Sequence, residues 1–228
     1  MSEQWRETLY LLGFLSTLAF GVRMLTQWLY SEYLGKSVVT HIFWRLSICG
    51  NVLLALHSFF QLQFHVFIAQ VANGVVAWRN LNLMAPTEKH LSTRTTIAIM
   101  GCALLIGTAL FASQAFFADG LTWFRIPKTP WSSSEHEVAW FWHIFGTAGI
   151  LLFNSRFWFQ WWNAEQKQKS FLSIGFWWMS ITGELICLVY FLHILDFVNI
   201  IGPLFAIIPY ARNIMLLLMP RQHASLEK

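Results

Sequence analysis

The chain has 228 residues, of which 56% are hydrophobic, 17% aromatic and only 11% charged, with a formal net charge of +4. Soluble domains carry about 25% charged residues, so this chain lacks the polar groups that would cover a water-facing surface. With a mean hydropathy of +0.50, the composition excludes an ordinary soluble domain, and we expect membrane lipids rather than nucleic acid as partners.

Seven apolar stretches are each about as long as a bilayer-spanning helix, which needs roughly 20 residues. In chain order they cover 8–30, 39–60, 63–84, 95–118, 138–162, 171–193 and 195–219. We expect helices, because lipid offers no hydrogen-bond partner to an exposed backbone N–H or C=O group. The first four residues hold no basic segment, so we expect the first span to remain in the protein rather than to be removed as a signal peptide.

The first three spans carry a small set of polar and aromatic residues. Arg23 and Gln27 share one face near the end of the first span, because residues four apart lie on the same side of a helix. A short turn follows, the second span opens with an aromatic and polar stripe, and the third span closes with an arginine and an asparagine. The main members of this set are Arg23, Gln27, Glu32, Lys36, Trp44, Arg79 and Asn80.

The same set recurs 133 positions later without a gap, as an internal repeat. The copies are Arg156, Gln160, Glu165, Lys169, Trp177, Arg212 and Asn213, and Trp28, Ser37, Phe43, Ser47 and Gly50 recur in the same register as Trp161, Ser170, Phe176, Ser180 and Gly183. Polar and aromatic residues have survived the duplication, while the aliphatic residues between them have changed. Packing alone would favour the reverse, so the pattern indicates function.

Each repeat holds three spans, in residues 8–84 and 138–219. Three spans would invert the second repeat in the membrane, but the additional span 95–118 restores its orientation. We therefore predict an all-α integral membrane protein with seven transmembrane helices in a 3+1+3 order, two parallel three-helix bundles joined by a linker helix. The connection 119–137 is rich in proline and serine and is predicted to be irregular.

The basic residues of the loops predict the orientation. Successive loops alternate between the two sides of the membrane; one side holds Lys36, Lys89, Arg94, Lys167, Lys169, Arg221 and Lys228, and the other holds Arg6, Arg125 and Lys128. Cytoplasmic loops carry the excess of Lys and Arg. We therefore predict an N-terminus outside and a C-terminus in the cytoplasm.

The duplicated residues are expected to converge on the cytoplasmic half of each bundle, because the spans that carry them end or begin on that side. An arginine near the centre of a membrane helix is unfavourable by about 2.5 kcal/mol or more, so Arg23 and Arg156 need partners. Two roles fit them. They either form structural ion pairs with Glu32 and Glu165, or they present guanidinium groups to an anionic group such as a phosphate.

Two further duplicated sets leave alternatives open. Arg79 and Arg212 fit the same anion site, with Lys36 and Lys169 adding charge at the interface, or they serve as interfacial anchors. The tryptophans either belong to interfacial belts or form a stacking platform beside the arginines; they are Trp28, Trp44, Trp161 and Trp177.

Two charges have no counterpart in the other repeat. Arg45 corresponds to Trp178, and Glu184 corresponds to Asn51. We expect both charges to be buried, and we predict an ion pair between Arg45 and Glu184, with an ion or proton relay as the alternative. The histidines show no ligand spacing, so no metal or other cofactor is predicted.

The two copies resemble the lipid A biosynthesis N-terminal domain family, and the resemblance covers most of the chain. It rests on the pattern Arg23-x-x-x-Gln27-Trp28-x-x-Ser31-Glu32-x-x-x-Lys36-Ser37, followed by Phe43-Trp44-x-x-Ser47-x-x-Gly50 and Arg79-Asn80-Leu81. The second copy departs from the first at Ala164 and at Phe171-Leu172. The repeats are also distantly similar to the three-helix repeats of PQ-loop and SWEET sugar transporters, although both first spans lack the proline characteristic of those transporters.

The resemblance implies a bacterial inner-membrane protein of lipid A or related glycolipid biosynthesis. We expect it to bind a phosphorylated glycolipid at the cytoplasmic face and to assist a glycosyltransferase such as lipid-A-disaccharide synthase. A SWEET-like transporter or flippase of a glycolipid or sugar is the alternative. The family label implies synthase activity, but the spans and the linker account for the residues of this chain, so no glycosyltransferase domain and no catalytic residue are predicted.

Overall fold

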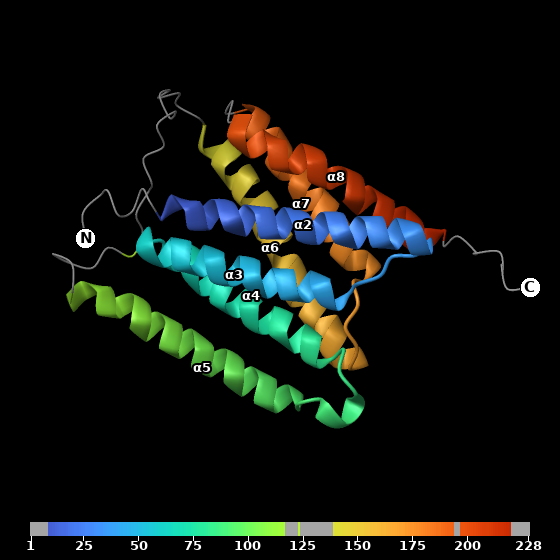
Figure 1. Ribbon diagram of the computed structural model, residues 1–228. Coiled ribbons are helices and arrows are strands. Elements are labelled where there is room, and N and C mark those ends of the chain that lie inside the picture. Colours follow the sequence, from blue (N-terminus) through green and yellow to red (C-terminus); the bar gives the residue numbers. More distant parts are fainter. Residues whose placement is uncertain (1–8, 117–122, 124–138, 194–196, 220–228) are drawn as a thin grey trace, which may run out of the picture. The chain divides into compact units, whose positions relative to one another are not determined.

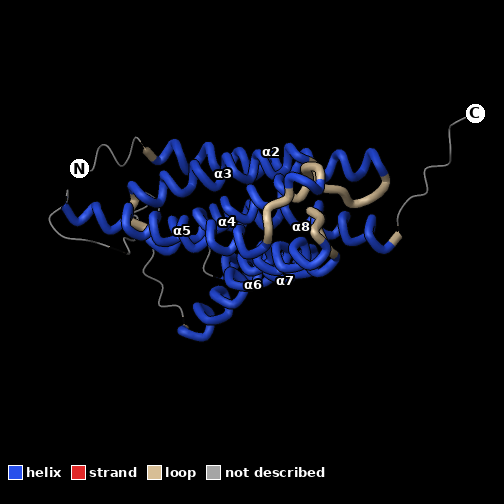
Figure 2. Tube along the Cα trace, turned by 90° about the horizontal axis from the view of Figure 1, so that it is seen from below, coloured by secondary structure: helices blue, strands red, loops and turns tan. Residues whose placement is uncertain are grey.

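The computed structural model describes residues 9–116, 123, 139–193 and 197–219. These residues form seven α-helices and two 3₁₀ turns, with no strand among them (Figures 1 and 2). The elements are α2 (Tyr10–Leu34), α3 (His41–Phe60), α4 (Phe64–Asn82), η1 (Thr87–Lys89), α5 (Thr93–Ala112), η2 (Ser113–Phe116), α6 (Trp140–Lys167), α7 (Ile174–His193) and α8 (Phe197–Leu218). The all-helical prediction is confirmed; apart from Trp123, the loop 119–137 lies outside the described residues, as do both termini.

Four described segments are long and apolar enough to cross a membrane. They are His41–Phe60, Thr93–Phe116, Ile174–His193 and Ile200–Leu218. The other three helices, α2, α4 and α6, are not among these four segments. Membrane-like helices are thus present among the described residues, and the arrangement of seven spans stays a prediction of the sequence.

The first helix of each repeat ends in the same backbone motif. Gly35 has a φ of 64°, and Gln168, its counterpart 133 residues later, has a φ of 47°. The amide N–H of the following residue reaches back to the last turn in both copies, from Lys36 to the carbonyl of Ser31 (3.2 Å) and from Lys169 to the carbonyl of Ala164 (3.1 Å). This is the Schellman arrangement, which satisfies carbonyls at a helix end. Both repeats therefore turn at equivalent positions.

The helices group into two compact units whose limits differ from those of the repeats. Unit 1 lies within Met1–Arg23 and His41–Ser132, and unit 2 within Met24–Thr40 and Ser133–Lys228. The second half of α2, from the first repeat, thus packs with helices of the second repeat. The proposed limits of the three-helix repeats stay a prediction of the sequence.

Unit 1 is built around α3 and α4, which lie side by side (Figure 1), with α5 against α4. Where the chain turns from α3 to α4, the apolar residues Leu62, Phe67 and Phe111 form a buried cluster. Trp123 stacks on Phe111, with ring centroids 5.7 Å apart. This cluster joins the end of α5 to the α3–α4 turn.

Unit 2 holds α6, α7 and α8, and glycines allow α6 and α7 to approach closely. A Cβ atom on Gly183 of α7 would lie 2.9 Å from the backbone N of Phe153 on α6. A Cβ on Gly149 of α6 would lie 2.7 Å from the side chain of Ile186 and 3.1 Å from the backbone N of Cys187. Small residues of this kind are typical where membrane helices pack, because they bring backbones together.

Candidate functional site

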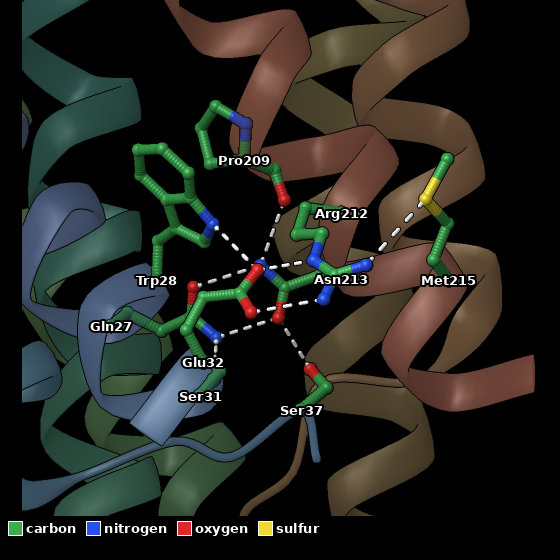
Figure 3. A network of polar contacts seen from close by, with 9 residues as sticks. All are labelled: Gln27, Trp28, Ser31, Glu32, Ser37, Pro209, Arg212, Asn213 and Met215. Atoms are coloured by element: carbon green, nitrogen blue, oxygen red, sulfur yellow. Dashed lines mark hydrogen bonds and ion pairs between the residues drawn. The ribbon is translucent and has the colours of Figure 1, made fainter. Parts of the chain in front are cut away.

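A cluster of buried polar side chains joins α2 to α8 in unit 2 (Figure 3). Gln27 donates from Nε2 to Asn213 Oδ1 (2.9 Å), and Asn213 donates from Nδ2 to Gln27 Oε1 (3.2 Å). Ser37, in the segment after α2, donates to the same Asn213 oxygen at 2.6 Å. Gln27 and Asn213 are fully buried. The two amides therefore satisfy each other away from solvent, as buried polar groups require.

An ion pair lies next to this cluster. Glu32 of α2 receives hydrogen bonds from Nε of Arg212 and, at 3.0 Å, from Nη2 of Arg212. The indole N–H of Trp28, one turn earlier on α2, donates to the same carboxylate at 3.3 Å. The two charged side chains are 27% and 28% exposed. Arg212 thus engages Glu32 with a two-pronged contact (Figure 3), which is specific in geometry.

The second repeat reproduces the local part of this arrangement within unit 2. Gln160 donates to the carbonyl of Phe171 (3.2 Å), as Gln27 donates to that of Val38 (3.0 Å). Trp161 donates to Glu165 at 3.0 Å, as its counterpart does to Glu32. The duplicated glutamine therefore fixes the turn after each first helix.

Arg23 lies in an aromatic cradle in unit 1. Its guanidinium carbon is 4.9 Å from the ring centre of Phe20 and 5.0 Å from that of Phe43. Its Nη1 donates to Ser47 Oγ at 3.1 Å. Gly50 makes room for this arrangement, because a Cβ there would lie 2.5 Å from the Phe20 ring. The side chain is 5% exposed, and cation–π contacts of this kind stabilise a desolvated guanidinium.

Arg156 occupies the equivalent cradle in unit 2. Its guanidinium carbon is 3.4 Å from the ring centre of Phe153 and 5.5 Å from that of Phe176. These two phenylalanines are the counterparts of those around the first-repeat arginine. The cradle is extended by Phe157 and by Tyr210 of α8, whose hydroxyl receives a hydrogen bond from Arg156 Nη1 at 3.3 Å. With 3% exposure, the guanidinium is enclosed by aromatic rings.

Arg79 and Arg212, which are equivalent in sequence, have different surroundings. Arg79 is fully buried, and its Nη1 donates to Asn82 Oδ1 (2.6 Å) and to the carbonyl of Leu91 (2.8 Å). It therefore holds the segment after α4 in place. The asparagines that follow the two arginines are closer copies, since Asn80 and Asn213 each donate to the carbonyl four residues earlier, at 2.9 Å and 2.8 Å.

The other predicted site residues divide into buried and exposed groups. Trp44 and Trp177 are 1% and 0% exposed, so they belong to the packed interior of their units rather than to an interfacial belt. Lys36 and Lys169 are exposed. The expected burial of Arg45 is wrong, because its side chain points outward from α3, whereas Glu184 is buried as expected.

The pairing of Arg45 with Glu184 stays a prediction. So does the convergence of the complete duplicated set on one face of the membrane. What unit 2 does bring together is the group drawn in Figure 3, whose members come from both repeats.

Two kinds of residue that contact the buried arginines were not predicted from the sequence. Phe20 and Phe153, which contact the arginines, recur at the common offset of 133 residues, so the repeat itself could have identified them. Tyr210 could not be found in that way, because its counterpart in the first repeat is Ala77.

Long apolar helices, buried arginines in matched aromatic cradles and a duplicated polar motif define a class, that of helical membrane proteins with an internal duplication. The chain belongs to the family described as the Lipid A Biosynthesis N-terminal domain, whose model matches residues 12–82 and 145–215. The two matched regions are offset by the same 133 residues (from 12 to 145 and from 82 to 215). The resemblance read from the sequence is confirmed.

The chain is similar to lipid-A-disaccharide synthases of Chlamydia. The protein of Chlamydia abortus is 30% identical over 215 residues, and that of Chlamydia felis is 33% identical over 215 residues. In both cases the match covers 92% of this chain but 33% of the relative, so the chain spans about a third of the length of these relatives. No solved structure matches the chain. The family and these relatives associate the chain with lipid A biosynthesis.

Proposed function

We propose that this protein binds a phosphorylated glycolipid in the membrane and assists a glycosyltransferase of lipid A synthesis. The observation that carries the proposal is the duplicated buried arginine. Arg23 and Arg156 each sit in an aromatic cradle within their own unit. An arginine in such surroundings is unfavourable unless it serves a purpose, and structural packing could be achieved with an apolar residue.

A guanidinium group suits a phosphate ligand for two reasons. It stays charged in apolar surroundings, and its planar fork matches the oxygens of a phosphate. The aromatic rings beneath it remove water, which strengthens a charge-assisted hydrogen bond to an anion. The remaining duplicated polar residues support these cradles in the proposal, either by fixing the turn after the first helix or by linking α2 to α8.

The assisting role rests on the relatives, which carry the name lipid-A-disaccharide synthase over a length about three times that of the match. We propose that the matched third supplies lipid binding, and that the glycosyl transfer itself is performed by a separate protein or domain. The first test of this division is the lipid that the protein holds.

Removal of both arginines tests lipid binding. We expect the phosphorylated lipid retained by an Arg23→Gln/Arg156→Gln double variant to fall at least about tenfold below the wild-type level, because the variant keeps neither guanidinium group that could bind the phosphate. Native mass spectrometry of the purified protein, at matched folded concentration, measures the retained lipid. The control is Arg94→Gln/Lys167→Gln, which removes the same charge from exposed side chains and is expected to leave retention unchanged.

The double variant also distinguishes a ligand-binding role of these arginines from a purely structural one. A double variant that keeps wild-type lipid while losing thermal stability would show that the arginines only hold the helices together, and the binding proposal would then be wrong.

We also propose a topology of seven membrane spans in a bacterial inner membrane, with the N-terminus outside. It is supported by the placement of the loop lysines and arginines and by the four apolar spans. In a chain whose three native cysteines are replaced, Lys36→Cys and Lys169→Cys should be protected from an impermeant maleimide in intact spheroplasts. Ser133→Cys, in the connection 119–137 that the proposed topology places on the opposite side, should react. Labelling of all three positions from one side would refute the arrangement.

A further inference from the structure

The cradle of the second repeat contains two buried hydrogen-bond donors that the protein does not satisfy. They are Nε of Arg156 and Nε1 of Trp177, and neither has a partner within the part of the chain that the structure describes. Both side chains are at least nine-tenths buried, at 3% and 0% exposure. A buried donor without a partner destabilises a protein, so two such donors in one cradle indicate an acceptor that the described part of the chain does not supply.

The two side chains that carry these donors both contact Tyr210 of α8. Trp177 packs against it, with ring centroids 5.9 Å apart, and Arg156 reaches its hydroxyl at 3.3 Å. Three helices therefore each contribute one donor side chain: α6 the guanidinium, α7 the indole and α8 the phenol. The nearby serine, Ser180, is already engaged, since it donates to the carbonyl of Phe176 at 2.6 Å.

One acidic group lies close to this cradle. Glu184, one turn beyond Ser180 on α7, is 8% exposed and interacts electrostatically with Arg156. Among the described residues, however, no ion pair joins them. The Nε donor of Arg156 therefore stays open, and the cradle has more hydrogen-bond donors than acceptors.

The first repeat lacks the phenol and the acid of this cradle. Ala77 stands where the second repeat has Tyr210, and Asn51 stands where it has Glu184. In unit 1, Arg23 donates to Ser47 in place of a phenol. The two cradles share their arginine and phenylalanines, but the added phenol and acid belong to the second alone.

We propose that Arg156, Trp177 and Tyr210 form the receptor for one phosphate group, and that the cradle of the first repeat is its structural counterpart. The inference rests on the proposed lipid binding and deepens it, because it assigns the phosphate to unit 2 and adds Tyr210 as a binding residue. Phosphate fits the cradle because it offers several acceptor oxygens and a negative charge to donors from three directions. The source of the phosphate is a lipid headgroup or a free anion.

Titration with defined probes tests this assignment. The full chain in dodecyl maltoside is titrated with dioleoyl phosphatidic acid, with dioleoyl phosphatidylcholine as the control, and with inorganic phosphate in a parallel arm; native mass spectrometry measures binding. We expect Arg156→Gln to weaken binding of the phosphate probe that the wild-type protein prefers by at least about tenfold. Tyr210→Phe, which keeps the ring, should weaken the same binding by about three- to tenfold. Arg23→Gln should change affinity by less than about threefold.

Glu184→Gln gives a result in the opposite direction. Removal of a carboxylate near an anion site should tighten phosphate binding, whereas loss of a purely structural charge would leave the affinity unchanged. Because Tyr210→Phe and Glu184→Gln alter few atoms, they keep the test decisive even if Arg156→Gln fails to fold.

The outcomes separate this inference from the proposed function. Binding of phosphatidic acid would identify the ligand as a lipid headgroup and support both proposals. Binding of inorganic phosphate alone would identify the ligand as a free anion, which supports this receptor but not the proposed lipid binding. If the double arginine variant loses lipid while Tyr210→Phe and Glu184→Gln match the wild type, lipid binding stands and this receptor is wrong. If neither probe binds the wild-type protein, the receptor is also wrong.

Discussion

Replacement of Gly183 by alanine is expected to destabilise the protein by about 3 kcal/mol, the upper end of what overpacking causes. The added Cβ would lie 2.9 Å from the backbone N of Phe153 and 3.0 Å from its Cα. Backbone atoms of a neighbouring helix cannot turn aside as a flexible side chain can, so α6 and α7 would have to separate. Because the ring of Phe153 packs against the guanidinium group of Arg156, the binding cradle should be disturbed as well.

The matched control is Gly101→Ala in α5. A Cβ at Gly101 meets nothing within 4 Å, and alanine favours a helix over glycine by up to about 1 kcal/mol. The same substitution should therefore be neutral or slightly stabilising there. Thermal unfolding in detergent, followed by circular dichroism, compares the two variants; equal melting temperatures would contradict the close packing of α6 against α7.

Substitution of Asn213 by leucine is expected to destabilise the protein by about 2–4 kcal/mol. The amide of Asn213 is fully buried and bonds Gln27 in both directions, while its oxygen also accepts from Ser37. Leucine would leave the buried amide of Gln27 with fewer partners, and each unsatisfied group is unfavourable by about 1–3 kcal/mol.

Asn154→Leu serves as the control for this substitution. Asn154 donates to the carbonyl four residues earlier at 2.8 Å, as Asn213 does, but its side chain is exposed. We expect a change of less than about 0.5 kcal/mol, as for most surface substitutions.

A double variant completes the test. The losses in Gln27→Leu and Asn213→Leu should not add, because removal of both amides leaves less unsatisfied than removal of one. Additive losses in free energy of unfolding would mean that the two amides do not act as a pair.

Much of the architecture could be predicted because it depends on local sequence, and because the internal repeat presents that local sequence two times. The apolar stretches predicted helices, and the constant offset predicted that equivalent residues would adopt equivalent local structure. The matching ends of α2 and α6 at Gly35 and Gln168 illustrate this, as do the two arginine cradles. Such features depend on a few neighbouring residues or on adjacent helices of one repeat, and a duplicated sequence repeats them.

The partners of the polar residues were decided by the tertiary structure alone. Gln27 and Asn213 lie 186 positions apart, and Glu32 and Arg212 lie 180 apart. The repeat could not reveal these contacts, because they join the first helix of one copy to the third helix of the other. Identical residues also receive different partners, as Arg79 and Arg212 do, since the chain around each is different.

The sequence by itself therefore determined the helical membrane class, the duplication, the family and the arginines around which a binding site would form. Only the packing of α8 against its neighbours in unit 2 decided which residues complete that site. Tyr210 has no polar counterpart in the first repeat, so no pattern marks it, and its importance comes from its place beside Arg156 and Trp177. The physical reason is that helix formation and periodicity depend on nearby residues, whereas burial and hydrogen-bond pairing depend on which distant helices meet.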